Sequence, residues 1–161
     1  MIIKIEKEKP LLPEGSHSAV VAGVYSIGLH PGFQGEQPKR KHVILFELDE
    51  IIPEGKYTGQ PYIVSNMYND NLNEKSRLVE VVRALKGGLT SQETQSGFDP
   101  ESLCGAKCTI VTVNKTNGCK TSTSIVSVLR RDNSLPPLVP TFDRTKVPAW
   151  VQRLQSQRLD K

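Results

Sequence analysis

Long apolar runs, numerous cysteines and a signal sequence are all missing from this chain of 161 residues. No stretch approaches the roughly 18 apolar residues that a membrane-spanning helix requires. The first residues lack the apolar segment and the small-residue cleavage site of a signal peptide. Three cysteines, an odd number, argue against a disulfide framework. We therefore expect a cytoplasmic protein with no membrane partner.

Recognisable catalytic and metal-binding motifs are also lacking. There is no phosphate-cradling glycine-rich loop followed by Lys-Ser/Thr, and no nucleophile-elbow motif. Cys104 and Cys108 lie four residues apart, but the histidines are all far upstream, and a structural zinc site needs four nitrogen or sulfur ligands. The acidic pair Asp49-Glu50 is explained by a solvated strand end, because a two-metal nuclease needs several convergent carboxylates. We predict no enzyme activity, no cofactor and no metal.

What the chain does contain is typical of one globular domain with short extensions. Hydrophobic residues make up 37% and charged residues 24% of the sequence, which favours a folded protein over a disordered one. We expect an N-terminal arm over residues 1–17, a domain over 18–131 and a tail over 132–161. The net charge of +4 is compatible with a nucleic-acid partner but does not require one.

Five segments have the composition of β-strands. Residues 18–30 are rich in Val, Ile and Tyr, and Gly23 and Gly28 within them indicate bulges or a bend. Residues 41–51 follow, with Ile44, Phe46 and Leu48 on one side of the strand and Val43 and Leu45 on the other. Residues 61–68, 106–115 and 120–130 complete the set.

Two segments are predicted to be helical. Residues 74–86 place Leu78, Val81, Val82 and Leu85 on one face, with Asn73 as the N-cap and Gly87-Gly88 as the end. A short helical turn is expected near residues 99–103. Residues 147–158 form the tail helix, on which we expect Trp150 to anchor the tail to the domain.

Asn117-Gly118 predicts a two-residue type I′ turn between the last two strands. That turn sets Ile110 opposite Ile125 on an uncharged face, and Lys115 opposite Lys120 beside the tip. The side-chain pattern supports this register less strongly than the turn does.

The order strand, strand, strand, helix, strand, strand favours a mainly β fold, a five-stranded antiparallel Greek-key barrel of the OB type. One helix lies between strands 3 and 4, and a tail helix follows the domain. A sandwich of tandem β-hairpins is the competing architecture, but it does not explain the position of the helix.

OB-folds bind oligonucleotides on the face of strands 2 and 3, between the loops that join strands 1–2 and strands 4–5. Single-strand binding needs cations for the backbone and aromatic faces for the bases. Both loops are basic here, and aromatic residues lie in or near strand 3. The candidate DNA-binding residues are Phe33, Lys39, Arg40, Lys41, Tyr57, Tyr62, Tyr68, Lys115 and Lys120.

Each candidate also has an ordinary structural explanation. The three consecutive cations at 39–41 fit a solvated loop, and Lys115 and Lys120 fit a solvated hairpin tip. Phe33 is equally consistent with a small plug inside its loop. The tyrosines at 57, 62 and 68 are equally consistent with barrel packing.

As a set, several short motifs resemble a family of small phage proteins from replication and recombination gene clusters, in which single-stranded-DNA binding is the usual assignment. The resemblance covers roughly residues 10–131 and again 147–156. The motifs lie at residues 19–24, 32–35, 41, 46–48, 72–76, 97–99, 103–105, 118, 124–126 and 148–151. The resemblance implies an OB-type core and a place in the host cytoplasm, and it supplies no catalytic residue.

Two functions remain open at this point. The first is sequence-tolerant binding of single-stranded DNA in phage replication or recombination. The second is a non-catalytic adaptor of a phage replication complex, with phage or host replication and recombination proteins as partners. The sequence leaves homo-oligomerisation open, because exposed strand edges are able to pair between chains.

Overall fold

A computed structural model describes residues 10–32, 35–70, 76–118, 120–131, 141–142 and 146–159, with only the backbone of Thr94 and Lys120. Its elements are the strands β1 (Gly15–His30), β2 (Lys39–Ile51) and β3 (Pro61–Asn69), the helices α1 (Arg77–Lys86) and α2 (Ser91–Ser96), the 3₁₀ helix η2 (Pro100–Leu103), the strands β4 (Lys107–Asn117) and β5 (Lys120–Arg130), and the tail helix α3 (Ala149–Ser156). The predicted order of strands and longer helices is confirmed, whereas α2 was not predicted. No helix in the described ranges is long and apolar enough to cross a membrane.

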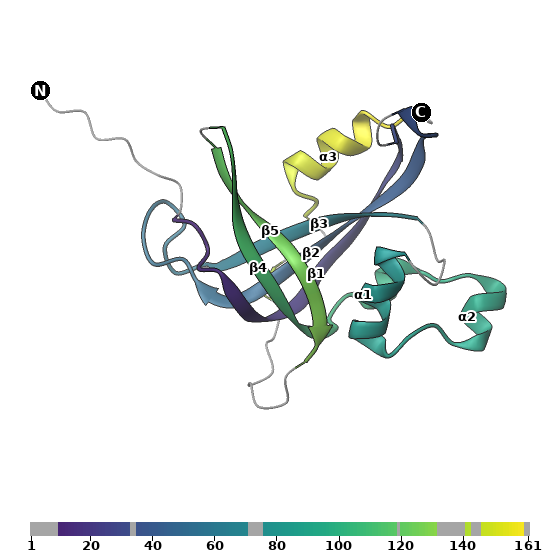
Figure 1. The fold of residues 1–161 in the computed structure, drawn as a ribbon, viewed down its shortest axis with the longest axis horizontal. Coiled ribbons are helices and arrows are strands. Elements are labelled where there is room, and N and C mark those ends of the chain that lie inside the picture. The colour runs from purple at the N-terminus through teal and green to yellow at the C-terminus, as the bar shows by residue number, and fades with distance from the viewer. Residues whose placement is uncertain are drawn as a thin grey trace, which may run out of the picture.

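The five strands form one antiparallel sheet in the order β3-β2-β1-β4-β5 (Figure 1). Strand β1 lies at its centre, where residues 15–20 pair with β4 and residues 19–30 pair with β2. Its pairing with β2 shifts register between Val21 and Gly23 and again between Ser26 and Gly28. The two predicted irregularities are therefore confirmed, and they let one strand serve both halves of the sheet.

The sheet does not close into the expected barrel, since no hydrogen-bonded ladder joins β3 to β5 in the part of the chain that the structure describes. The two edge strands nevertheless approach each other, and α1 packs across both of them. Side chains such as Val81, Ile125 and Val128 pack against the core and line the space that remains between the edges. Along this seam, contacts with α1 and between side chains take the place of backbone pairing.

The main core lies on the inner face of the sheet, under α1. Ile44, Phe46 and Leu48 of β2 all point into it, whereas Val43 and Leu45 lie in a second cluster on the outer face, as the alternation predicts. Each such side chain, when fully buried, contributes about 1.5–3 kcal/mol. Two faces of one sheet are therefore covered, which identifies β2 as a central strand.

Helix α1 contributes Leu78, Val81 and Val82 to the inner core, as the helical periodicity predicts. Its N-cap is Ser76, whose side chain accepts a hydrogen bond from the backbone N of Val79 at 3.2 Å. The expected cap, Asn73, lies outside the described residues. Gly87 ends the helix with a φ of 85°, a left-handed conformation that favours glycine.

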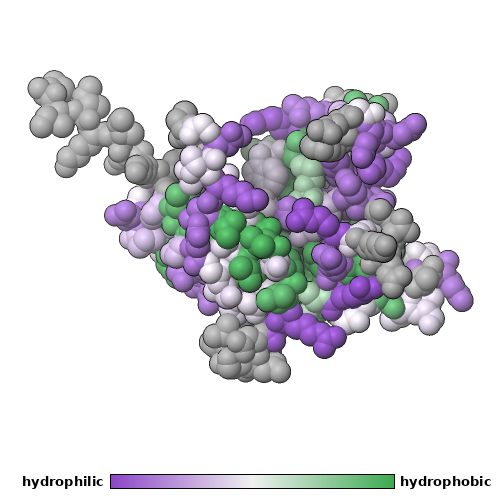
Figure 2. Space-filling view, in the orientation of Figure 1, coloured by the Kyte–Doolittle hydropathy of each residue, from purple (hydrophilic) through white to green (hydrophobic). Residues whose placement is uncertain are grey.

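The predicted register of the last hairpin is wrong. Asn117 pairs with Lys120, so the turn lies one residue later than expected, and Lys115 faces Ser122. A bulge between Val111 and Thr112 then shifts the pairing again, which turns Val128 towards the core and leaves Val126 and Leu129 exposed. Figure 2 shows the resulting apolar surface in the region of β5.

Cys108 provides a test of this core. It is fully buried against the inner cluster, and burial raises the pKa of its thiol from 9.0 to about 12. In a Cys104→Ser/Cys119→Ser variant we expect Cys108 to resist a thiol reagent at pH 8 and to react completely in guanidinium, because the thiolate is the reactive form. Reaction of the folded protein at the rate of the unfolded one would contradict the fold.

Candidate nucleic-acid interface

The three consecutive cations predicted to contact DNA lie at the start of β2, where Lys39, Arg40 and Lys41 pair with the last residues of β1. Lys39 is exposed and forms an ion pair with Glu36 at 3.2 Å. Arg40 is also exposed, whereas Lys41 is half-buried. An exposed pair such as that of Lys39 is worth little energy, so Lys39 remains accessible to a phosphate.

The second predicted group of cations, Lys115 and Lys120, belongs to the β4–β5 hairpin, whose β4 pairs with the N-terminal part of β1. Lys115 is exposed near the tip of the β4–β5 hairpin, and it faces Ser122 rather than Lys120. The side chain of Lys120 and the whole of Phe33 lie outside the described residues. Figure 1 shows the ends of the β1–β2 and β4–β5 hairpins on either side of α3.

The tyrosines predicted to stack on bases belong to the core or its edge. Tyr62 and Tyr68 are only 4% and 3% exposed, and their hydroxyl groups bond within the fold, to the carbonyl of Pro10 at 2.8 Å and to the side-chain amide of Asn66 at 3.3 Å. Burial raises the pKa of Tyr68, so its hydroxyl stays protonated. Tyr57 is half-buried, with the Lys56 ammonium 5.5 Å from its ring centre. Packing rather than stacking accounts for these rings in this conformation.

Lys41 and Arg77 come together in one pocket, although they are 36 positions apart in the chain. The pocket has a volume of about 410 Å³ and is lined by the end of β3 and the start of α1. Among the residues that the structure describes, neither cation forms an ion pair. The exposed side chain of Met67 gives the pocket an apolar wall. Among the described residues that line this pocket, none is acidic, so an anion that enters it meets Lys41 and Arg77 without a carboxylate from that lining.

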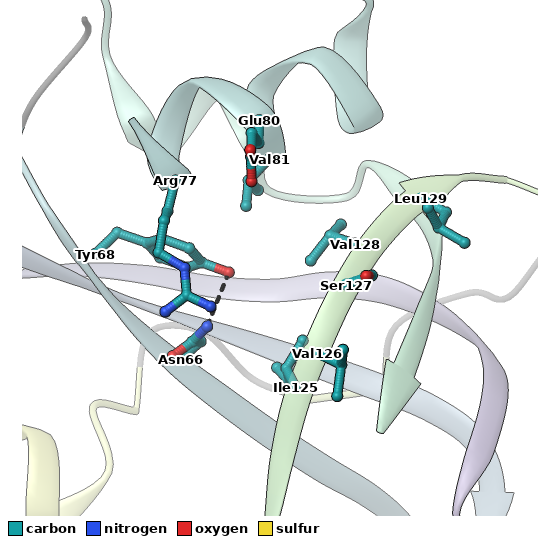
Figure 3. A pocket seen from close by; sticks show the side chains of 10 residues that line it. All are labelled: Asn66, Tyr68, Arg77, Glu80, Val81, Ile125, Val126, Ser127, Val128 and Leu129. Atoms are coloured by element: carbon teal, nitrogen blue, oxygen red, sulfur yellow. Dashed lines mark hydrogen bonds between the residues drawn. The ribbon is translucent and has the colours of Figure 1, made fainter. Parts of the chain in front are cut away.

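A second cavity of about 300 Å³ continues from this pocket along the seam between β3 and β5. The two spaces share Tyr68 and Arg77. In Figure 3 the Arg77 side chain leaves α1 and reaches down beside Tyr68 and Asn66, while residues 125–129 form the opposite wall. Glu80 is the acidic residue among the described side chains that line the second cavity, whereas the described lining of the first pocket contains no acidic residue.

Sequence reasoning did not identify Arg77. On the helix, Arg77 lies outside the apolar stripe, as every solvated cation on an amphipathic helix does, so this position does not distinguish a binding residue from a solvated one. Its position in the pocket follows from the way α1 crosses the edge of β3, which is a tertiary contact. No local pattern contains that information.

The outer face of the sheet, where an OB-fold would bind its ligand, is covered by the tail. Val151 is completely buried against an apolar cluster from β1 and β2, and Phe142, Val147 and Leu154 pack around it. Trp150, the expected anchor, is instead 40% exposed. The completely buried residue of the docked helix is therefore Val151, while more than half of the surface of Trp150 is also covered.

A buried carboxylate fixes the start of the described tail. Glu47 is 1% exposed on the outer face of β2, and its oxygens accept hydrogen bonds from the backbone N of Thr141 at 2.8 Å, the hydroxyl of Thr141 at 2.6 Å and the backbone N of Phe142 at 3.0 Å. A buried charge requires such partners. In the sequence, Glu47 stands out as an acidic residue within an apolar strand, which indicates a buried carboxylate that needs hydrogen-bond donors. The sequence does not show that Thr141 and Phe142 supply those donors.

Comparison with protein-family models gave no match, and comparison with curated proteins gave no significant match. In the described ranges no three His, Cys, Asp or Glu side chains lie together as a metal site would require. The chemistry that the described side chains offer is anion binding by cations next to apolar surface.

The contact between Glu47 and the tail is testable by substitution. Glu47→Ala leaves the donors of Thr141 and Phe142 without an acceptor, so we expect unfolding in urea to be easier by roughly 1–3 kcal/mol and protease to remove the tail faster. Asp49→Ala removes the same charge from an exposed position on the same strand and should cost less than about 0.5 kcal/mol. Equal effects of the two substitutions would show that the carboxylate does not hold the tail.

Proposed function

We propose that this protein binds single-stranded DNA without strong sequence preference, on an OB-type core, and acts in phage DNA replication or recombination. The strand order supports the OB-type assignment, because β1 pairs with both β2 and β4. Helix α1 follows β3 and precedes β4 in the chain, and in space it packs across the open seam between β3 and β5. Full closure between β3 and β5 would complete such a barrel.

The pocket that contains Lys41 and Arg77 is the observation that carries the proposal. Two cations without ion-pair partners in the described ranges, next to the exposed cations of the β1–β2 hairpin, form a track for phosphate groups. A phosphate at Arg77 accepts two parallel hydrogen bonds from the guanidinium group, whereas Lys41 contributes a point charge. Met67 offers an apolar contact to a neighbouring base. Contacts of these kinds are sequence-tolerant.

A second candidate function rests on the exposed apolar residues of β5. Val126 and Leu129 project from an edge strand of the sheet, and apolar residues exposed together in this way often mark protein interfaces (Figure 2). This observation favours the adaptor function in a replication complex. An adaptor requires no salt-sensitive affinity for nucleic acid, and a Val126→Ser/Leu129→Ser variant would lose its protein partner.

Titration of labelled oligo-dT at several salt concentrations tests the DNA-binding proposal. We expect affinity that falls steeply with salt, because binding releases counterions from the strand. A Lys41→Gln/Arg77→Gln variant should bind at least about tenfold more weakly, and the slope of log affinity against log salt should flatten by roughly 1.4. Fluorescence anisotropy measures both quantities.

The matched control is a Lys56→Gln/Lys107→Gln variant, which removes the same charge from two exposed lysines that do not line the pocket. It should keep nearly the affinity and slope of the unmodified protein. Equal losses in both variants would attribute binding to net charge alone and exclude the pocket as the site. Absence of salt-dependent binding by the unmodified protein would overturn the proposed function.

A further inference from the structure

In the view of Figure 1, helix α3 lies between the ends of the two hairpins that were expected to clasp the DNA, and it contacts β1. The C-terminal end of α3 and the residues that follow it are hydrogen-bonded to the last part of strand β1. The side-chain amide of Gln155 donates to the carbonyl of Ser26 at 3.0 Å, and the backbone N of Leu159 donates to the carbonyl of Leu29 at 2.7 Å. Leu29 pairs with Arg40 in the sheet. The tail therefore ends beside the predicted basic residues of β2.

The orientation of α3 decides which of its side chains face outward. Val151 is completely buried, and Leu154 and Gln155 lie on the same side of the helix, half-buried. Arg153 lies on the opposite, exposed side. Trp150 lies on the flank between the two sides, three positions before Arg153 and four before Leu154, and it is 40% exposed. The chain contains no other tryptophan. A large aromatic ring and a cation are thus presented together to solvent.

The charge of this segment is entirely positive. Residues 146–159 contain Lys146, Arg153 and Arg158 and no acidic residue, and all three cations are exposed. Arg158 directly precedes Leu159, whose backbone is bonded to Leu29 at the end of β1. Arg158 therefore lies near the end of β1 where Leu29 pairs with Arg40, while Arg153 and Lys146 lie earlier along the tail.

We propose that the exposed side of α3 joins Lys39 and Arg40 in a composite surface for single-stranded nucleic acid, in which Trp150 stacks on a base and Arg153 and Arg158 contact phosphates. This inference rests on the proposed function and assigns to the tail an aromatic contact that the buried Tyr62 and Tyr68 do not offer. Tyr62 and Tyr68 are buried in the core, and the outer face of β2 is covered by the tail itself. In this proposal, a single strand of nucleic acid that approaches the region between the two hairpins meets the docked helix α3.

The chemistry of this surface fits an unpaired strand better than an apolar protein partner. Single-strand binding combines a cationic track with aromatic faces that accept any base, and cations are attracted to a polyanion over a distance of about one Debye length. An apolar partner would instead require a desolvated patch, and the helix neighbours of Trp150 are the cation Arg153, three positions on, and the half-buried Leu154, four positions on. A protein partner on this helix is the alternative outcome of the test.

Trp150 provides its own signal, since all tryptophan fluorescence of the protein comes from this residue. Titration of the full chain with unlabelled oligo-dT should quench that emission, with the same midpoint as the anisotropy of a labelled oligo-dT. Trp150→Ala should weaken affinity by between about five- and 150-fold, the range that corresponds to one stacked base. Trp150→Phe retains a ring and should lose only a few-fold.

The outcomes separate this inference from the function on which it rests. If oligo-dT binds with full affinity while the emission and the Trp150→Ala variant stay unaffected, the composite surface is wrong and DNA binding stands. If oligo-dT does not bind at all, the proposed function fails. Circular dichroism and urea unfolding of both variants establish that they are folded, and equal losses in Trp150→Ala and Trp150→Phe would also overturn the stacking role.

Discussion

The pairing of one strand with two different partners is the constraint on which the rest of the structure depends. Strand β1 joins β2 along one part of its length and β4 along another, and both ladders overlap at Ala19 and Val20. A flat strand cannot serve two halves of a curved sheet, and the register shifts near Gly23 and Gly28 provide the bends. The positions of both hairpins, and therefore of every candidate cation on them, follow from this strand.

The alternation along β2 determines how the two faces of the sheet are used. The inner residues pack under α1, and the outer residues would leave an apolar surface exposed if nothing covered them. The tail meets this requirement with Val151 as its apolar contact and Glu47 as its polar anchor. Burial of the outer face is therefore a condition of stability, and it removes from contact the face that OB-folds normally offer to a ligand.

Much of this fold was predictable because it is encoded in local periodicity. The five strands, the faces of β2, the stripe of α1 and the irregular glycines all follow from spacing along the chain. The register of β5 was not predictable, since a bulge at Val111 and a turn shifted by one residue both change the pairing. The roles of Trp150 and Arg77 depend on which side of a helix meets the sheet, and two adjacent apolar residues such as Trp150 and Val151 leave that choice open until the helix is docked.

These differences change where a nucleic-acid surface is to be sought. Sequence reasoning placed two of its four aromatic contacts, Tyr62 and Tyr68, in β3. Rings large enough to stack on bases are also the side chains that gain most from burial, and both of these tyrosines are in the core. The same preference for burial makes the exposure of Trp150 unusual, since the adjacent Val151 is buried and Trp150 is not. The covered part of the Trp150 ring contributes to packing, and its exposed part lies three positions from Arg153 on the helix. In the proposed composite surface, that exposed part is what contacts a base, and the neighbouring positive charge attracts the phosphates of the strand.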